Sequence, residues 1–454
     1  MKNADVLLSR LTSIYLTLMV SVYLLYPGFG GYIDITAQKW RLFLVLSGCY
    51  LGGSVLLRLE LAAVGGGRLS GPKTVWCRMS LPEKMIIGYW ACSGVSTALS
   101  VDRGTALLGG GRYEGFLTLS LYCGCFLLVA RYGKPSAWLL EVFASAVSIN
   151  CVLALIQLAG YNPLGLYPPG MSYYDANIRY AGQFLGTIGN VDIQSALLSI
   201  AIPFFWIGLW KLPGQRRLFL LPPLGLAMTV LFWSSVAGGI VGILGSAVLS
   251  VPVLMRTRRA KALAAAVMCC LCVASGLVVY NLGGETEGTI REASELMHGR
   301  WDDSFGSGRL YIWRSALDLI PERPLIGGGP DTFGLRTEAS FERYDEDLGF
   351  TIHSSVDVAH NEYLNILVNQ GFFALTFYLA ALMSVFWKWV RSASVVPAAA
   401  VCGGGALGYC VQAFFGISSP ITAPYFWLTF ALLLAVLVSA AQKTKEKDAE
   451  RSYL

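Results

Sequence analysis

Long uncharged apolar runs alternate with short charged or glycine- and proline-rich connections along the whole chain. A helix needs roughly 20 apolar residues to cross a hydrocarbon core of about 30 Å, and most of the runs approach that length. Ending each run at a charge cluster or a turn predicts twelve membrane-spanning helices. They are expected at about 11–27, 42–57, 85–101, 115–130, 136–159, 191–210, 218–234, 237–255, 262–282, 362–387, 394–415 and 423–441.

One polar stretch, between the ninth and tenth predicted spans, has a helical periodicity of its own. Within 309–320, the apolar residues Leu310, Trp313, Leu317 and Ile320 recur at helical spacing, whereas Arg309 falls elsewhere on the helical wheel. This pattern predicts an amphipathic helix that rests on the bundle or at the membrane interface.

Lysine and arginine are concentrated in alternate connections, and such positive flanking charge is retained on the cytoplasmic side. The connections predicted to be cytoplasmic are the basic ones, at 58–84, 131–134, 211–217, 256–261 and 388–391. Both termini belong to the same side, and the opposite connections contain Lys39 as their only lysine. The predicted fold is therefore an all-α polytopic membrane protein with one large extracytoplasmic loop, 283–360, that contains amphipathic helices.

This layout divides the chain into five parts, and its short cytoplasmic pieces carry two minor predictions. Residues 75–81 are expected to form an ordinary linker rather than a helix lying on the inner surface. The tail beyond Gln442 is expected to be disordered. The parts are N-terminal helices (1–110), a transmembrane core (111–282), the extracytoplasmic loop (283–360), C-terminal helices (361–441) and the cytoplasmic tail (442–454).

The composition agrees with a membrane location. Of 454 residues, 55% are hydrophobic and only 14% are charged, which is too apolar for an ordinary soluble domain. The net charge of +6 follows from the basic cytoplasmic connections, so it does not indicate a nucleic-acid partner. The eleven cysteines lie in predicted spans or, for Cys77, in a cytoplasmic connection, so they predict no disulfide framework.

The residues that could carry chemistry gather in the long loop. Segment 283–360 contains all three histidines, seven arginines and fifteen acidic residues, but no lysine. His360 directly precedes a predicted span, where a helix N-terminus tends to keep an imidazole neutral and able to accept a proton. The alternative is a polar residue that only caps the helix. No metal is expected, because the histidines show no ligand spacing.

Two other outer connections carry arginines and possible anion sites. The glycine-rich segment 109–115 could cradle a phosphate through its N–H groups, and Arg112 within it needs a ligand or a partner, for which Glu114 is the nearest candidate. In the longer connection, Arg179, Asn190 and Asp192 form a polar rim at the start of a span. Asn190 and Asp192 either favour an anion there or simply cap the helix.

Arginines and one histidine at the mouth of an apolar bundle suit a substrate with an anionic headgroup and a lipid tail. Guanidinium groups match phosphate oxygens and stabilise the charge of a leaving diphosphate, and a neutral histidine can accept a proton from an attacking hydroxyl. An ion-coupled carrier usually keeps ionisable residues near the middle of the membrane. Apart from charges at span starts, Glu141 is the only charged residue within a predicted span, and it lies near the inner face.

The order of several motifs resembles the family of O-antigen ligases and Wzy-type polymerases. The similarity rests on Gly308-Arg-Leu-Tyr-Ile-Trp313, Pro324-Leu-Ile-Gly-Gly-Gly-Pro-Asp-Thr-Phe333, His360-Asn-Glu-Tyr-Leu364 and Gln370-Gly371, with Arg179 and 186–192 further upstream. The resemblance implies transfer of a glycan from an undecaprenyl-diphosphate donor to a hydroxyl of a glycan or lipid acceptor. It places the reaction on the outer face of the bacterial inner membrane and requires no metal or nucleotide cofactor.

The resemblance also implies roles for individual residues. His360 matches the histidine that activates the acceptor, and Arg179 matches an arginine that binds the diphosphate; Arg309 and Arg112 are candidates for further phosphate contacts. The supporting residues of the expected site are Asn190, Asp192, Asn361 and Glu362.

The sequence departs from the family pattern at two places. The family's Ser-Arg-Gly is Ser234-Ser235-Val236 here, so one expected arginine is missing, and its Asn-Pro-Asn is Asn190-Val191-Asp192. Two alternative functions therefore remain open at this point. One is a transporter of a small anion or a lipid-linked sugar, and the other is a catalytically silent subunit of a polysaccharide assembly system.

Overall fold

The computed structural model describes residues 2–64, 71–167, 174–175, 178–179, 185–345 and 350–452, and a helix lies at each of the twelve predicted positions. The bundle helices are α1 (Lys2–Leu18, continued by the π-helical η1, Met19–Tyr23), α2 (Ile35–Val64), α4 (Leu81–Ala98), α6 (Phe116–Tyr132), α7 (Ala137–Leu158), α8 (Val191–Lys211), α9 (Leu221–Ser234, after the 3-10 helix η2, Gln215–Leu220), α10 (Ala237–Leu254), α11 (Arg258–Leu282), α15 (Glu362–Ser392), α16 (Pro397–Gln412) and α17 (Ala423–Ser452).

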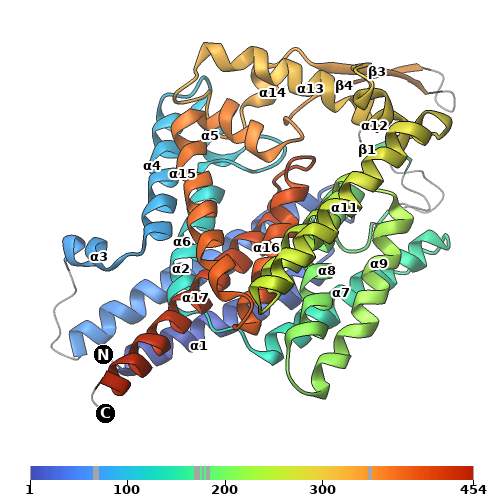
Figure 1. The fold of residues 1–454 in the computed structure, drawn as a ribbon. Coiled ribbons are helices and arrows are strands. Elements are labelled where there is room, and N and C mark those ends of the chain that lie inside the picture. Colours follow the sequence, from blue (N-terminus) through green and yellow to red (C-terminus); the bar gives the residue numbers. More distant parts are fainter. Residues whose placement is uncertain are drawn as a thin grey trace.

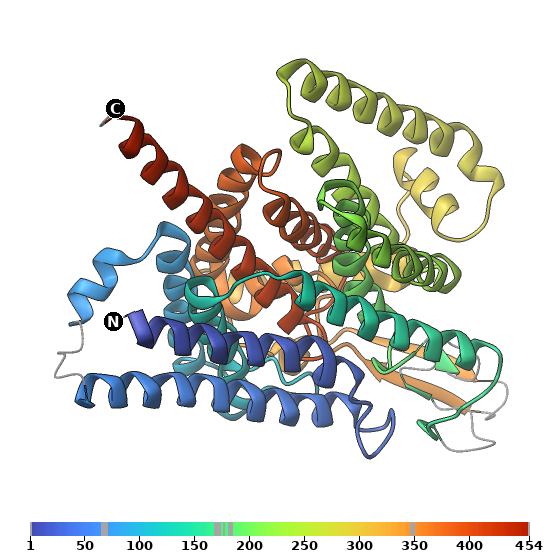
Figure 2. The same ribbon diagram turned by 90° about the horizontal axis from the view of Figure 1, so that it is seen from below.

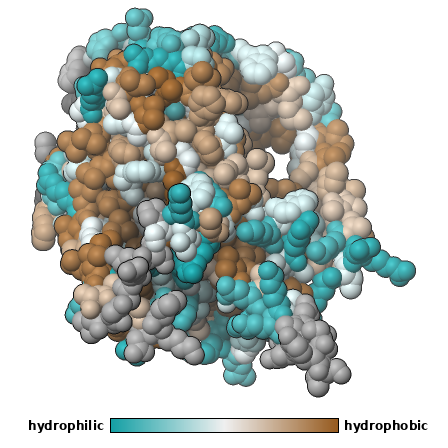
Figure 3. All heavy atoms as spheres, turned by 90° about the vertical axis from the view of Figure 1, so that its left-hand side faces the viewer, coloured by the Kyte–Doolittle hydropathy of each residue, from teal (hydrophilic) through white to brown (hydrophobic). Residues whose placement is uncertain are grey.

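Nine helices of the described residues are long and apolar enough to cross a membrane. The predicted all-helical membrane fold is therefore confirmed, whereas the count of twelve spans stays a prediction, because α4, α6 and α16 do not meet the same measure of length and hydropathy. Apolar side chains form a band around the middle of the molecule, between two hydrophilic ends (Figure 3). Such a band is what a bilayer requires.

Close backbone contact holds the centre of the bundle together. On α16, Gly408 lies so near α8 that a Cβ there would be 2.1 Å from the carbonyl oxygen of Ser199. Small residues at such positions let membrane helices approach closely, which is the main source of packing energy between them. Helix α11 differs, because it projects from the side of the bundle (Figure 2) and none of its residues is buried.

The segment corresponding to the predicted loop lies across one end of the bundle, whereas both chain termini lie at the opposite end (Figure 1). Its helices pack on α15 through a small second core that includes Ile312, Ala316, Phe333 and Val368. Its elements are η3 (Gly283–Glu285), α12 (Thr289–Met297), α13 (Phe305–Leu319), η4 (Ile320–Glu322), α14 (Phe333–Arg336), β3 (Ser340–Asp345) and β4 (Phe350–Ser355).

The strands β3 and β4 form an antiparallel hairpin that the sequence analysis did not predict. Acidic residues such as Glu342 and Asp345 are uncommon in strands, so the sequence did not indicate this hairpin. The remaining short elements are α3 (Pro72–Arg78), α5 (Arg103–Leu108) and the two-residue strands β1 (Tyr174–Asp175) and β2 (Ile178–Arg179).

Three local predictions were wrong. The amphipathic helix forms as α13, but its buried face consists of Gly308, Ile312, Ala316 and Leu319, and Leu317 is exposed. The buried face lies about one residue away from the predicted one, and it includes Gly308 and Ala316, small residues to which a pattern of large apolar side chains gives little weight. The favoured linker contains the helix α3, and the tail continues α17 as a helix to Ser452. Alanine, lysine and glutamate in that tail are good helix formers.

Helix α15 breaks at Gly371, and the break interlocks with the turn at 324–329. The φ of Gly371 is +84°, so the helical hydrogen bonds across it are lost. The freed carbonyl groups of Val368 and Asn369 accept the N–H groups of Gly328 (3.2 Å) and Gly329 (2.7 Å). In return, the N–H of Phe372 donates to the carbonyl of Pro324 at 2.9 Å. Two of the quoted motifs therefore form one backbone joint.

We expect Gly371→Ala to destabilise the protein by at least about 2 kcal/mol, because the left-handed backbone disfavours a side chain. The new Cβ would also lie 2.3 Å from the carbonyl oxygen of Leu325. The measurement is the temperature at which the detergent-solubilised protein loses its monodisperse elution. Gly52→Ala on α2 is the matched control, because no atom lies within 4 Å of its new Cβ. If both variants lost monodisperse elution at the same temperature, the backbone joint between α15 and the turn at 324–329 would be contradicted.

Candidate active site between the long loop and the helix bundle

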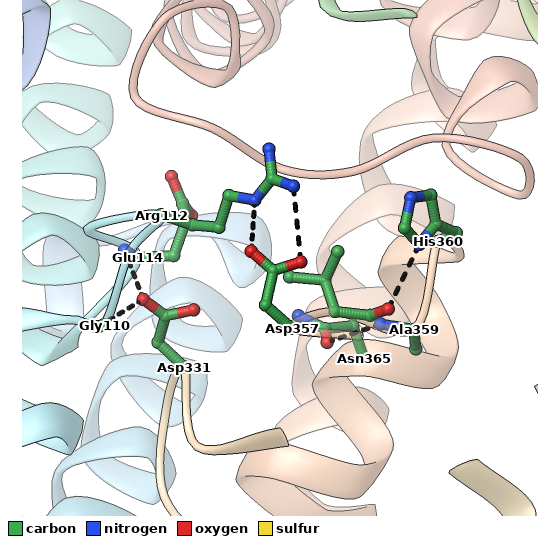
Figure 4. A network of polar contacts seen from close by, with 9 residues as sticks. Gly110, Arg112, Glu114, Asp331, Asp357, Ala359, His360 and Asn365 are labelled. Carbon is green, nitrogen blue, oxygen red and sulfur yellow. Dashed lines mark hydrogen bonds and ion pairs between the residues drawn. The ribbon is translucent and has the colours of Figure 1, made fainter. Parts of the chain in front are cut away.

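His360 lies at the junction between the loop and α15, one residue before the helix cap. Its backbone is in the left-handed region with φ +48°, which is uncommon for a residue with a side chain. Its Nδ1 lies 3.1 Å from the carbonyl oxygen of Val358 (Figure 4). A carbonyl can only accept, so in the neutral imidazole Nδ1 carries the proton and donates it, and Nε2 is left as the basic nitrogen.

The surroundings favour the neutral form of His360. Burial lowers the pKa of His360 below its ordinary value, and the positive charges of Arg309 and Arg112 lower it further. The hydrogen bond to Val358 and the charge of Asp357 act in the opposite direction without reversing the shift. The sequence had predicted a neutral imidazole from the helix terminus, but burial is the larger cause in the structure.

Arg309 is placed by an unusual turn at the start of α13. Gly306, Ser307 and Gly308 all have positive φ, and the Nη1 of Arg309 donates to the carbonyl of Gly306 at 2.8 Å. Its Nη2 lies 3.8 Å from the Oδ1 of Asp192 at the start of α8. The side chain is only 17% exposed. The loop and the middle of the chain therefore meet at this arginine.

Two buried donors in the first turns of α13 lack hydrogen-bond partners within the described part of the chain. They are the Nε of Arg309 itself and the Nε1 of Trp313, one turn further along α13. Buried donors are nearly always satisfied in folded proteins, so unsatisfied ones need an explanation such as a ligand. Beside a guanidinium, the ligand that fits best is an anion with several acceptor oxygens.

Arg112 is paired with Asp357 rather than with Glu114. Its Nε and Nη2 donate to the two carboxylate oxygens of Asp357 at 2.6 and 3.3 Å. Glu114 is buried on the bundle side, where it accepts the hydroxyl groups of Tyr122 and Ser418, both at 2.8 Å. Burial raises the pKa of Glu114 to about 8. The predicted partner was wrong, because Glu114 is directed into the bundle.

The glycine-rich loop binds an anion, but the anion belongs to the protein. The N–H groups of Gly110 and Glu114 donate to the Oδ2 of Asp331 at 2.7 and 3.2 Å (Figure 4). Burial raises the pKa of Asp331 to about 6, although these two hydrogen bonds favour its charged form. The loop thus has the anion-binding property that its glycines indicated, with a carboxylate in place of the suggested phosphate.

Three predicted supporting residues have structural roles. Asn190 caps α8 and Asn361 caps α15, each accepting the N–H three residues ahead, at 3.1 and 3.0 Å. Glu362 is buried and accepts the hydroxyl groups of Tyr378 and Tyr409 at 2.8 and 2.9 Å. It joins α15 to α16 below the site. Asp192 differs from these residues, because it is 44% exposed and faces Arg309.

The structure brings together His360, Arg309, Asp192 and Arg112, whereas the side chain of Arg179 lies outside the described residues. Two acidic residues were missed, Asp331 and Asp357. Asp331 belongs to a quoted motif, so it could have been singled out, but no sequence pattern marks Asp357. Among the described residues, no group of three histidine, cysteine or acidic side chains is arranged to hold a metal ion.

The long apolar helices and the cluster of polar residues at one end of them define a multi-pass membrane protein with an arginine- and histidine-containing candidate site. Residues 222–379 match the family described as O-antigen ligase, so this segment is similar to that family. The match begins in α9 and ends within α15, so it includes Arg309 and His360 but not Arg112, Arg179 or Asp192. No curated protein matches the chain.

The titration of His360 can be measured in a protein that retains it as the single histidine. Only the neutral imidazole reacts with diethyl pyrocarbonate, so the rate of modification should fall as the pH is lowered. We expect the midpoint of this fall below about pH 6.5, which is the ordinary pKa of a histidine. His298→Gln and His353→Gln supply this background. Arg309→Gln should move the midpoint upward by removing a positive charge. A midpoint at or above the ordinary value would contradict the described environment.

Proposed function

We propose that the protein transfers a glycan from an undecaprenyl-diphosphate donor to a hydroxyl group of an acceptor, at the outer face of the bacterial inner membrane. The family match supports a membrane ligase or polymerase of this kind. The observation that carries the proposal is the presence in one site of His360, whose Nε2 is left to accept a proton, and of buried donors on Arg309 and Trp313 that have no hydrogen-bond partner among the described residues. In this proposal both termini are cytoplasmic, and the segment 283–360 is extracytoplasmic.

His360 is the proposed general base. Its Nε2 accepts the proton of the acceptor hydroxyl as that oxygen attacks the anomeric carbon of the donor glycan. A new carbon–oxygen bond forms, and the bond between the anomeric carbon and the phosphate oxygen breaks. The bonding electrons leave with the diphosphate. A neutral base is required, and the burial of His360 together with two nearby arginines favours that state.

The arginines are proposed to bind the diphosphate and to stabilise the charge that develops on it. Arg309 offers its unsatisfied Nε, and Trp313 offers a second buried donor on the same helix. Arg112 contributes its charge from the position where Asp357 holds it. Arg179 completes the set by its match to the family motif. These groups supply positive charge without a metal ion or a nucleotide cofactor.

The apolar helices accommodate the rest of the donor. An isoprenoid chain is insoluble in water, so its diphosphate must be bound at the boundary between the bilayer and the polar end of the bundle. The site lies at such a boundary, because Arg309 and His360 belong to the elements that cover the end of the apolar helices (Figure 1). The acceptor approaches from the water-filled side.

We expect His360→Asn to reduce transfer by roughly 10²-fold or more, because general base catalysis contributes that much. Asparagine tolerates the positive φ at this position, so backbone strain is not the cause. The assay uses the protein in liposomes with lipid-linked glycan extracted from the cells that produce it, and follows polymer formation.

The matched control is His353→Gln on the exposed hairpin, where the histidine is paired with Glu342 at 3.1 Å. Binding of undecaprenyl diphosphate should be unchanged in both variants. Full transfer by His360→Asn would exclude His360 as the general base, whereas absence of transfer by the unsubstituted protein would instead support a carrier or a silent assembly subunit.

For the donor site, Arg309→Gln should weaken binding of undecaprenyl diphosphate by about 10-fold or more, the effect of losing a charge-assisted hydrogen bond. Arg314→Gln on the same helix is the matched control, because Arg314 is 66% exposed and paired with Asp303. Binding is measured with undecaprenyl diphosphate in detergent by native mass spectrometry. Equal affinity of the two variants would exclude Arg309 from the diphosphate site.

A further inference from the structure

Asp331 is a charged residue of the site that neither binds a substrate in the proposed reaction nor faces His360 directly. Its carboxylate accepts the N–H groups of Gly110 and Glu114, the residues two positions before and after Arg112. It therefore holds the loop on both sides of the arginine. A hydrogen bond from either residue alone would leave the other side of the loop free to move.

We propose that Asp331 is a positioning residue for the transfer reaction, and that it acts by holding the loop from which Arg112 reaches Asp357 beside His360. The inference rests on the proposed function and adds a residue to it. Arginine has a long side chain that loses considerable entropy when it is fixed, so both its backbone and its tip need anchors. Asp331 anchors the backbone, and Asp357 anchors the guanidinium.

Asp331 connects the loop to the same helix that carries the base. The turn before it is bound to α15 by the N–H groups of Gly328 and Gly329, which donate to the carbonyls of Val368 and Asn369. The N-terminus of α15 follows His360 directly, and the N–H of Ala359 donates to Asn365 one turn into that helix at 3.4 Å. Arg112 and His360 are therefore positioned from one rigid element.

Backbone strain is concentrated in this network. Five residues other than glycine have positive φ in the described part of the chain, and three of them are Tyr113, Asp331 and His360. Tyr113 follows Arg112 and is fixed by stacking on Trp40, with ring centroids 4.6 Å apart. Such conformations cost free energy and persist only where the surrounding contacts impose them. Their coincidence here indicates that the relative positions of the loop, Asp331 and His360 are tightly determined.

The first test compares two substitutions of Asp331. Asp331→Gly removes the acceptor but tolerates the positive φ, so we expect the rate at saturating donor to fall by about 10-fold or more, as expected for a misplaced group. The KM for the extracted lipid-linked glycan should rise by a smaller factor than the rate falls, because Arg309 still binds the diphosphate. Asp331→Asn keeps an acceptor oxygen and also tolerates the backbone, so it should recover most of the lost rate.

A double-mutant cycle tests whether Asp331 acts through Arg112. If it does, Asp331→Gly combined with Arg112→Gln should be no slower than Arg112→Gln alone, because coupled residues do not add. Asp318→Asn, an exposed acidic residue on α13, is the control for a change of charge. The proposal would be overturned if the rate losses of Asp331→Gly and Arg112→Gln multiplied in the double variant. It would also be overturned if Asp331→Asn were as slow as Asp331→Gly.

A readout without turnover separates this proposal from the function on which it rests. Beside burial and Arg309, the positive charge of Arg112 lowers the pKa of His360, and the titration midpoint of the single-histidine protein reads out this pKa. Release of Arg112 by Asp331→Gly should raise that midpoint toward the value in Arg112→Gln. A raised midpoint in a protein without transferase activity would overturn the proposed function but retain the positioning role. An unchanged midpoint would overturn the positioning role even in an active enzyme.

Discussion

Backbone polar groups in the interior of a membrane protein have little water to satisfy them, so a break in a helix needs partners from elsewhere in the chain. The break of α15 at Gly371 meets this requirement through the turn at 324–329, whose N–H and carbonyl groups replace the lost helical ones. The joint fixes the loop segment on the bundle. Since His360 precedes α15 and Asp331 follows the turn, the geometry of the site depends on it.

The charges of the site are arranged around this joint in pairs. Arg112 is matched with Asp357, and Arg309 lies near Asp192, so each cation approaches an anion from a different part of the chain. The partial exposure of these pairs leaves them accessible to a ligand. Burial lowers the pKa of His360 and the positive charges of Arg309 and Arg112 lower it further, so the site favours the neutral imidazole. The same arrangement would allow the arginines to bind a diphosphate beside a histidine that can accept a proton.

Particular residues show how far the sequence could lead. The positions of the helices and the place of His360 just before one of them were predictable, since both follow from the length and order of the apolar runs. The pairing of Arg112 was not, because Glu114 is two residues away in sequence and Asp357 is 245 away. The buried face of α13 was misassigned because it includes Gly308 and Ala316, small residues to which a hydropathy pattern gives little weight.

The sequence by itself determined that the chain forms apolar helices with basic connections and a polar, lysine-free segment, because these properties follow from composition and local periodicity. Only the tertiary structure decided which carboxylate each arginine meets, which anion the loop at 109–115 holds, and how the turn and the break in α15 interlock. These contacts join residues that are far apart in the chain, and no local pattern contains the distance between them.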